Sequence, residues 1–232
     1  MFRYAVMGVL SLVAGNAWAQ QPPPPAGVPA PASSPASTPP KAVVPMEEPQ
    51  PGDHWTYEVR DEITGTVSAT RTNVVTEVAP AEISTRVNTL GKPDPGQIVF
   101  DRSWNMIISG SWKYSPNDGT GIRRPLAVGK TWTFQTNNVN AANGNIWKRT
   151  GTSKVVGEET VTTKAGTFET FKIETSFSAR NVNDPTRKNE VTSETWYAPA
   201  VDHWVKRTFI SRANGHLTDN NTIELTEYGR KQ

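Results

Sequence analysis

The chain has 232 residues, no cysteine, and 24 Lys and Arg against 22 Asp and Glu, so its formal charge is only +2. Without cysteine it cannot use disulfides, thiol catalysis, cysteine-ligated zinc, iron–sulfur clusters or a lipid anchor at a lipobox cysteine. Electrostatic nucleic-acid binding needs clustered Lys and Arg, and this sequence has only short basic pairs, so we expect no nucleic-acid partner.

The first 19 residues are typical of a secretory signal peptide. Arg3 supplies the positive charge, residues 5–15 form a short apolar run, and residues 17–19 (AWA) form a small-x-small cleavage site. We therefore expect cleavage after Ala19 and a periplasmic or secreted location. A transmembrane helix needs about 20 apolar residues. Because this run is shorter, we expect no transmembrane segment in the mature chain.

Residues 20–51 are dominated by Pro, Ala and Ser and contain almost no large apolar side chains. Such a composition cannot offset the entropy of ordering, and it predicts a disordered, partly polyproline II linker. At about 3.1 Å per residue, roughly 30 residues could reach on the order of 90 Å. The segment is either a tether that carries a domain away from a membrane or a plain spacer.

From residue 52 onward, apolar and polar residues alternate, which is the period of half-buried strands. Trp55, Tyr57 and Val59 fall on one face of the first expected strand. Further expected strands include residues 72–78, 83–87, 97–102, 105–109, 146–156, 191–197, 203–210 and 222–228. Because no helical period extends over ten residues, we expect residues 52–230 to form a single antiparallel β domain.

The breaks between these strands have the composition of tight turns. They contain the dipeptides Thr64-Gly65, Asn143-Gly144, Ala165-Gly166 and Asn214-Gly215. Glycine adopts a positive φ without steric cost, and the tightest hairpin turns require such a conformation. The sequence therefore predicts that these four positions reverse the chain.

A faint internal repeat links the two halves of the domain. Residues 52–57 (GDHWTY) parallel residues 129–134 (GKTWTF), and residues 72–77 (TNVVTE) parallel residues 152–158 (TSKVVGE). Two related halves would together form one long, strongly curved antiparallel sheet. The alternative is similarity without duplication, because β-sequences resemble one another readily. The period is too long for a solenoid.

Four phrases occur in order in the second half of the chain. They are residues 125–132 (PLAVGKTW), 159–172 (ETVTTKAGTFETFK), 194–206 (ETWYAPAVDHWVK) and 224–228 (ELTEY). As a set, they resemble a widespread group of exported bacterial β-domains of unknown function. The resemblance covers about residues 125–228 and extends more weakly to the region from residue 52.

The resemblance implies a curved antiparallel sheet similar to the half-barrels of periplasmic lipoprotein carriers. It implies no established reaction and no catalytic residue. Together with the strand pattern, it predicts an all-β, half-barrel-like fold. If the concave face of this sheet is open and apolar, the similarity to the carriers implies a lipid-like ligand.

Large aromatic residues are the main source of a core in this domain. Each buried large apolar side chain contributes about 1.5–3 kcal/mol, and a one-sheet protein without disulfides needs several of them. We expect the core to contain Trp55, Tyr57, Trp132, Phe134, Phe168, Phe171, Trp196 and Trp204.

Three other tryptophans are candidates for a ligand surface. Trp104, Trp112 and Trp147 are less regularly patterned and lie near Gly- and Asn-rich loops. They could contact the face of a sugar or an acyl chain, and core packing is the alternative for each of them.

No catalytic or metal-binding pattern is recognisable. His54, His203 and His216 lack the spacing of metal ligands, and neither a G-x-S-x-G nor an S-x-x-K motif is present. Residues 117–121 (NDGTG) are glycine-rich, but neither a helical pattern nor a Lys-Ser/Thr pair follows them, which argues against a phosphate-binding loop. We expect no catalytic residue, no cofactor and no metal site.

The leading hypothesis is therefore a non-enzymatic domain of the cell envelope that binds a ligand or has a structural role. Its partner is a lipid-like molecule, a glycan or an envelope protein. A carbohydrate- or cell-wall-binding module is the first alternative, and an enzyme of an unrecognised type is the second.

Overall fold

The computed structural model describes residues 45–46 and 48–230. Over these residues the chain forms twelve β-strands and one short 3-10 helix. The expected signal peptide and most of the expected linker lie outside the described residues. The elements are β1 (His54–Asp61), β2 (Thr66–Val78), β3 (Glu82–Thr89), β4 (Gly96–Asp101), β5 (Met106–Ser109), β6 (Trp112–Ser115), β7 (Thr131–Asn140), β8 (Ile146–Thr163), β9 (Gly166–Asn181), β10 (Lys188–Ala198), η1 (Pro199–Val201), β11 (His203–Ala213) and β12 (His216–Gly229).

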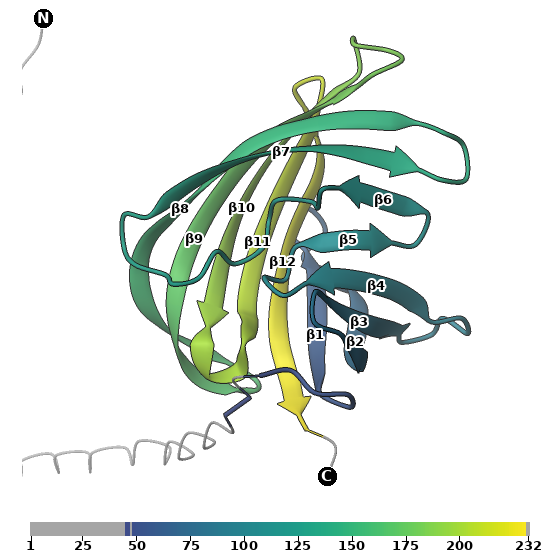
Figure 1. Ribbon diagram of the computed structural model, residues 1–232. Coiled ribbons are helices and arrows are strands. Elements are labelled where there is room, and N and C mark those ends of the chain that lie inside the picture. The colour runs from purple at the N-terminus through teal and green to yellow at the C-terminus, as the bar shows by residue number, and fades with distance from the viewer. Residues whose placement is uncertain (1–44, 47, 231–232) are drawn as a thin grey trace, which may run out of the picture. The chain divides into compact units, whose positions relative to one another are not determined.

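All twelve strands belong to one antiparallel sheet that closes into a barrel (Figure 1). Each strand pairs with its neighbours along the chain, and β1 also pairs with β12, from His54 opposite Gly229 to Asp61 opposite Asn221. The predicted long, strongly curved antiparallel sheet is thus confirmed, and its curvature continues to full closure. Closure pairs the two edge strands, whose backbone groups would otherwise stay open. Within the described residues, no helix is long and apolar enough to cross a membrane.

The four predicted turns all connect neighbouring strands. Gly65, Gly144 and Gly215 have φ values of 70°, 69° and 84°, and Asn214 also has a positive φ of 49°. These values lie in the left-handed region that glycine and asparagine tolerate. The turn prediction is therefore confirmed at the backbone.

The two halves repeat a local geometry as well as a sequence pattern. The Gly52 N–H donates to the Val75 carbonyl at 2.8 Å, and the Gly129 N–H donates to the Val155 carbonyl at 2.8 Å. Each valine N–H in turn donates to the residue after its glycine. A shift in strand register follows both valines. This equivalence supports the interpretation of two related halves, β1–β6 and β7–β12.

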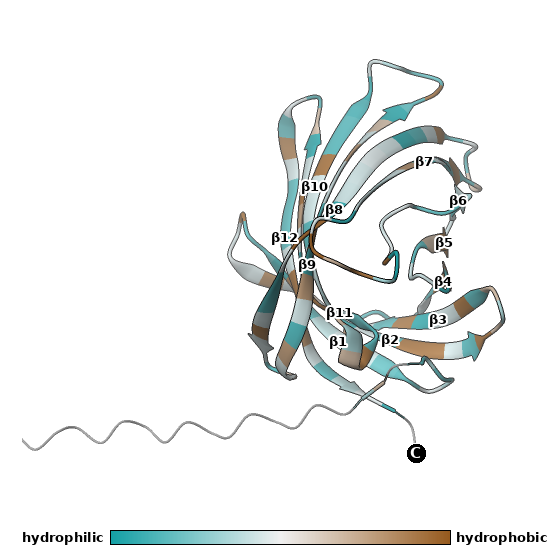
Figure 2. Cartoon of the chain, turned by 60° about the vertical axis from the view of Figure 1, so that its left-hand side comes forward, coloured by the Kyte–Doolittle hydropathy of each residue, from teal (hydrophilic) through white to brown (hydrophobic). Residues whose placement is uncertain are grey.

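Strand β7 shows how the sequence forms the barrel interior. From Thr131 to Asn138 its residues alternate strictly between exposed and buried positions, and the alternation of hydropathy along the strands is visible in Figure 2. The buried positions are Trp132, Phe134, Thr136 and Asn138. Because successive side chains of a strand point to opposite faces, these four residues face inward. Their character changes from aromatic to polar along the strand.

One end of the interior is filled by interlocking rings, which we call the aromatic cluster (Trp55, Tyr57, Trp104, His203 and Trp204). The His203 ring stacks on Trp55 at a centroid distance of 4.6 Å and meets the edge of Trp104 at 4.7 Å. The Tyr57 hydroxyl lies 2.5 Å from His203 Nδ1 and donates to the Trp204 carbonyl at 2.9 Å. Burial, reinforced by the nearby Arg207 guanidinium, lowers the pKa of His203 well below its usual value, so the imidazole is neutral.

The described end of the expected linker packs against this same part of the barrel. Met46 is fully buried and belongs to the core cluster that contains Trp55. Its backbone N–H donates to the Ala200 carbonyl at 2.7 Å. The packed unit therefore begins several residues before Gly52.

Candidate functional site

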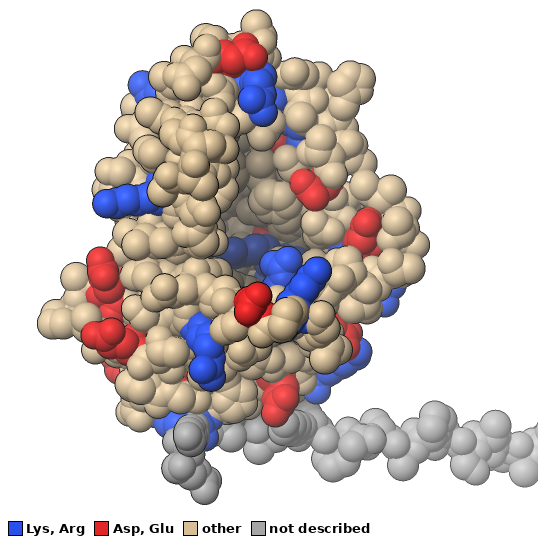
Figure 3. Space-filling view, turned by 90° about the vertical axis from the view of Figure 1, so that its right-hand side faces the viewer, with Lys and Arg blue, Asp and Glu red and all other residues tan. Residues whose placement is uncertain are grey.

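The opposite end of the barrel interior contains a cavity of about 520 Å³. It lies toward the turns that join β7 to β8, β9 to β10 and β11 to β12. Figure 3 shows the barrel hollowed on one face, with Lys and Arg atoms inside the margin of the hollow. Sites for small molecules usually measure about 300–1,000 Å³, so this volume suits a small ligand. We call it the lumen cavity.

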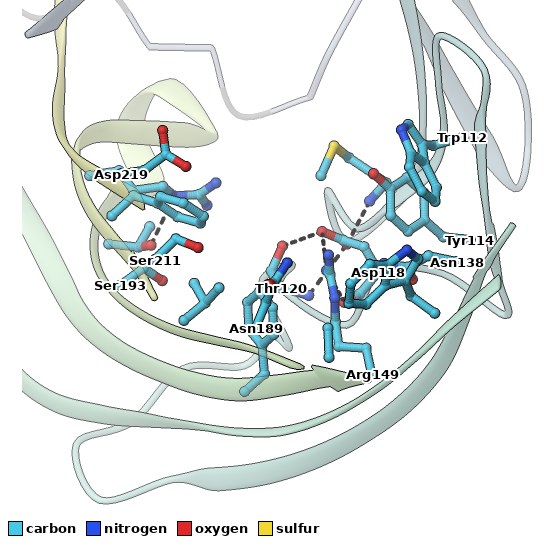
Figure 4. Close-up of a pocket in the computed structure, with 18 of the residues that line it drawn as sticks. Trp112, Tyr114, Asp118, Thr120, Asn138, Arg149, Asn189, Ser193, Ser211 and Asp219 are labelled. Carbon is cyan, nitrogen blue, oxygen red and sulfur yellow. Dashed lines mark hydrogen bonds and ion pairs between the residues drawn. The ribbon is translucent and has the colours of Figure 1, made fainter. Parts of the chain in front are cut away.

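Apolar and aromatic side chains form much of the cavity wall. Trp112 and Trp147 come from the strands on one side, and Phe177 and Phe209 come from β9 and β11. All four are only partly buried, because one face of each ring borders the cavity. In the close-up of Figure 4, the labelled residues stand around this space, with Trp112, Tyr114, Asp118, Asn138 and Arg149 on one side and Ser193, Ser211 and Asp219 on the other.

The floor of the cavity is the connection between β6 and β7, residues 116–130, which runs across the barrel interior in Figure 2. Asp118 and Thr120 line the cavity, whereas Ile122 is buried in a second apolar cluster beneath it. Gly121 allows this close passage, because a Cβ there would lie 2.3 Å from the Ser103 carbonyl oxygen. The glycine-rich stretch is thus a structural floor.

A buried ion pair sits on this floor. Arg149 Nη1 lies 3.8 Å from the Asp118 carboxylate and donates to the Asp118 carbonyl at 3.2 Å. Burial raises the pKa of Asp118, although hydrogen bonds from Thr120 and the charge of Arg149 oppose this shift. Burial also lowers the pKa of Arg149, against the attraction of Asp118. The two groups hold each other in the charged form at a place where neither would be stable alone.

Two polar groups of the cavity wall remain without a hydrogen-bond partner among the described residues. Asn138 is 6% exposed, and its side-chain oxygen has no partner. The Nε of Arg149, on the neighbouring strand β8, has none either. Buried polar groups in native proteins are nearly always paired. Both atoms are themselves closed off from the cavity, so a bound molecule would reach them only after a side-chain rearrangement.

A β-bulge positions the third important polar group, Arg207. In the pairing of β10 with β11, Trp196 lies opposite Lys206 and Tyr197 lies opposite Trp204, so Val205 is the extra residue. The bulge reverses the alternation of β11. Trp204 and Arg207 consequently face the same side, and the guanidinium carbon stands 4.1 Å from the Trp204 ring centroid.

Arg207 separates the lumen cavity from a smaller one. It lines the cavity of about 520 Å³ and also a cavity of about 140 Å³ that Tyr57 and Trp204 border. Its Nε donates to the Thr195 hydroxyl at 3.0 Å. None of the ion pairs formed by the described residues includes Arg207. Its burial lowers its pKa from the usual value, opposed by the more distant charge of Asp118.

The three tryptophans proposed as ligand contacts occupy two places. Trp112 and Trp147 both line the lumen cavity, where Arg187 stands over the Trp147 ring at 5.3 Å. Trp104 is 2% exposed and belongs to the aromatic cluster, where it borders the smaller cavity and does not line the lumen cavity. The structure thus brings two of them together and sets the third apart.

The eight residues expected in the core are all at least partly buried. Phe171 is partly exposed and packs against the cluster that contains Trp132. Trp196 belongs to the same core cluster as Trp55, and in addition its indole N–H donates to Glu159 and two lysines stand over its ring. The remaining six are Trp55, Tyr57, Trp132, Phe134, Phe168 and Trp204, each less than one-tenth exposed.

The three histidines do not gather at the cavity. His203 is enclosed in the aromatic cluster, His54 lies near Glu227 at 4.0 Å, and His216 is exposed at a turn. Among the described residues, no group of three His, Cys, Asp or Glu side chains is arranged to hold a metal ion.

Sequence reasoning missed the polar residues that give the cavity its character. Asn138, Arg149 and Arg207 were not singled out, because an isolated polar residue in a strand is usually solvated. Asp118 was considered only as part of the glycine-rich stretch 117–121. A signal existed for Asn138, which continues the inward series of Trp132 and Phe134 at period two. No such signal existed for Arg207, whose direction depends on the bulge.

Comparison with known proteins agrees with this architecture. Residues 125–208 match the DUF3108-like family, which supports the resemblance to exported β-domains of unknown function. The match covers less than half of the chain. No significant match was found among curated proteins.

Two solved structures share the fold. A candidate lipoprotein from Parabacteroides distasonis has 14% sequence identity and a TM-score of 0.52, covering 80% of this chain and 99% of that chain. A candidate exported protein with a YmcC-like fold from Bacteroides fragilis has 16% identity and a TM-score of 0.52, covering 82% of this chain and 100% of that chain. At these identities the likeness concerns the fold alone.

Proposed function

We propose that this protein is a non-enzymatic binding domain of the cell envelope that holds a small amphiphilic molecule in the lumen cavity. The observation that carries the proposal is a cavity of about 520 Å³ whose wall combines half-buried aromatic rings with polar and charged side chains. Ligand sites typically combine an apolar wall with a few such polar groups. The envelope location rests on the expected signal peptide and on the exported or lipoprotein character of the two structural neighbours.

A binding role fits the chemistry of the cavity better than catalysis does. Its one deeply buried carboxylate, Asp118, is already engaged by Arg149, Thr120 and the Met106 N–H. The buried histidine, His203, lies outside the cavity among aromatic rings. A general acid or base must reach the proton that it transfers, and neither group is placed to do so.

A glycan-binding surface has less support. Such surfaces use exposed aromatic rings, and the large hydrophobic side chains that are exposed in the described part of the chain are all aliphatic. They are Ile63, Val67, Leu90, Ile108, Val128, Val182 and Leu217. The aromatic rings of Trp112 and Trp147 instead line the cavity.

Native mass spectrometry of the protein purified from its own host tests the proposal. We expect a retained mass of roughly a few hundred daltons, the size of a ligand for this volume, and we expect organic extraction to remove it. A bare polypeptide mass would overturn the proposal.

A matched pair of variants on β9 locates the bound molecule. Ala179 faces the cavity, and Ala179→Phe adds a ring to the space that a ligand needs. Ser176 is exposed on the same strand, so Ser176→Phe adds the same ring outside. We expect the first variant to lose the retained mass and the second to keep it. Equal retention by both variants would place the molecule elsewhere.

A further inference from the structure

The charges that line the lumen cavity do not balance. They are Arg149, Arg187 and Arg207 against Asp118 and Asp219. Arg149 and Asp118 form the buried pair on the floor. Arg187 and Asp219 are both exposed at the rim, where water solvates charge at little cost. Arg207 is therefore the charge that neither an ion pair nor the open rim compensates.

The surroundings of Arg207 favour an anion as its missing partner. One of its five N–H donors is used, by the Thr195 hydroxyl, and the Trp204 ring stabilises the face of the guanidinium. The remaining donors form a planar fork that matches carboxylate and phosphate oxygens. Asp118 acts on it from a greater distance but is already paired with Arg149. The other titratable groups close to it are the Tyr57 hydroxyl and the neutral His203 ring, and neither supplies negative charge.

The position of Arg207 also determines which way a bound amphiphile lies in the lumen cavity. It stands where the lumen cavity meets the smaller cavity, whereas Trp112 and Trp147 lie toward the strand ends at the opposite side. A molecule that reaches Arg207 with a charged head leaves its apolar part beside Trp147, Phe177 and Phe209.

We infer that the lumen cavity selects an amphiphile with an anionic head group, a carboxylate or a phosphate, which enters head first and pairs with Arg207. This inference rests on the proposed function and specifies its ligand class. The head group receives hydrogen bonds from the guanidinium fork, and the apolar chain occupies the aromatic wall. A neutral amphiphile of the same length gains the wall contacts but leaves Arg207 unpaired.

Isothermal titration calorimetry tests the inference. It uses the full-length protein, from which organic extraction has removed any bound molecule, and three probes whose alkyl chains have equal length. The probes are decanoate, decyl phosphate and 1-decanol. We expect at least one anion to bind at least about 10-fold more tightly than the alcohol, since a hydrogen bond to a charged group commonly has this effect. The ratio of the two anions identifies which head group the site prefers.

Three variants assign the preference to one residue. Arg207→Gln should lower the affinity for the preferred anion at least about 10-fold while changing that for 1-decanol less than about 2-fold. Arg207→Lys, which keeps the charge, should retain part of the preference. Arg212 is exposed on the same strand, and Arg212→Gln should behave as the unchanged protein. Near-ultraviolet circular dichroism checks that each variant is folded.

The possible results separate the two proposals. Equal binding of anion and alcohol, or an undiminished anion preference in folded Arg207→Gln, would overturn anion selection and leave the lumen as a general amphiphile site. Absence of binding by all three probes, together with a bare polypeptide mass from the host, would overturn the binding function itself.

Discussion

The two ends of the barrel interior follow the same alternation but are filled differently. At one end the inward positions carry Trp55, Tyr57 and Trp204, whose rings contact one another or His203. At the other end, small residues such as Ala179 and Ser211 lie among the aromatic ones, and a cavity remains. Period two thus determines which residues face inward, whereas the size of those residues determines whether the interior is solid or hollow.

Removing one ring from each end should produce the largest difference. Trp55 is fully buried and its indole N–H donates to the Val201 carbonyl at 3.3 Å. Trp55→Ala should lower the free energy of unfolding by about 3–5 kcal/mol. Trp112 is only partly buried beside the cavity, and Trp112→Ala should cost only about 1 kcal/mol. Urea denaturation of both variants measures the two values.

Similar losses for Trp55→Ala and Trp112→Ala would contradict the comparison, because they would mean that the lumen end is packed as tightly as the aromatic cluster. Trp196→Ala serves as a reference between them. Its ring is buried in the core cluster, but two lysines also stand over it, so an intermediate loss is expected.

The filled end was accessible to sequence reasoning. Trp55 and Tyr57 follow a clean period-two pattern. The strand-connecting turns were equally accessible at either end, as at Asn214-Gly215, whose residues tolerate a positive φ. Alternation and turn chemistry are local properties, so a single sequence reveals them. They were sufficient for the all-β class and the strand-connecting turns, whereas the curved sheet was predicted from the internal repeat and the family resemblance.

The residues that line the hollow end could not be predicted from the sequence in the same way. Extending strict alternation from Trp204 would point Lys206 inward, and only the bulge at Val205 turns Arg207 into the barrel. The floor contributed by Asp118 depends on a loop that crosses the interior, which no period predicts. Trp104 was grouped with the cavity tryptophans, but a left-handed backbone with φ of 59° accompanies its burial in the aromatic cluster.

Enlarging one valine in each environment tests the comparison between packed and hollow interior from the other side. Val155 is fully buried in the apolar cluster of Ile122 and Trp132, whereas Val191 faces the lumen cavity. Val155→Phe should lower the free energy of unfolding by about 1–3 kcal/mol, since overpacking forces neighbouring side chains from their rotamers. Val191→Phe should change it by less than about 1 kcal/mol. Thermal unfolding of the two variants distinguishes these results, and equal destabilisation would show that the cavity cannot accept a ring.

The last expected effect is a pH dependence that arises from His203 at the filled end. Because the pKa of His203 is lowered by burial, the folded protein keeps this ring neutral, whereas the unfolded chain protonates it near pH 6.5. Its contribution to stability is therefore complete above pH 6.5 and declines as the pH falls, by up to about 1.4 kcal/mol per pH unit, until the folded pKa is reached. His203→Gln abolishes this titration and can still contact the Tyr57 hydroxyl.

The difference between the unfolding free energies of the parent protein and His203→Gln, measured by urea titration from pH 7.5 to pH 5, should consequently shrink as the pH falls. Asp118 and Asp202 have raised pKa values and act with the opposite sign, because their folded forms bind protons more readily than their unfolded forms. Both carboxylates are present in the two proteins, so subtraction removes their contribution. A difference that stays constant with pH would mean that the His203 ring meets water or a charge partner, and that the aromatic cluster is as open as the lumen.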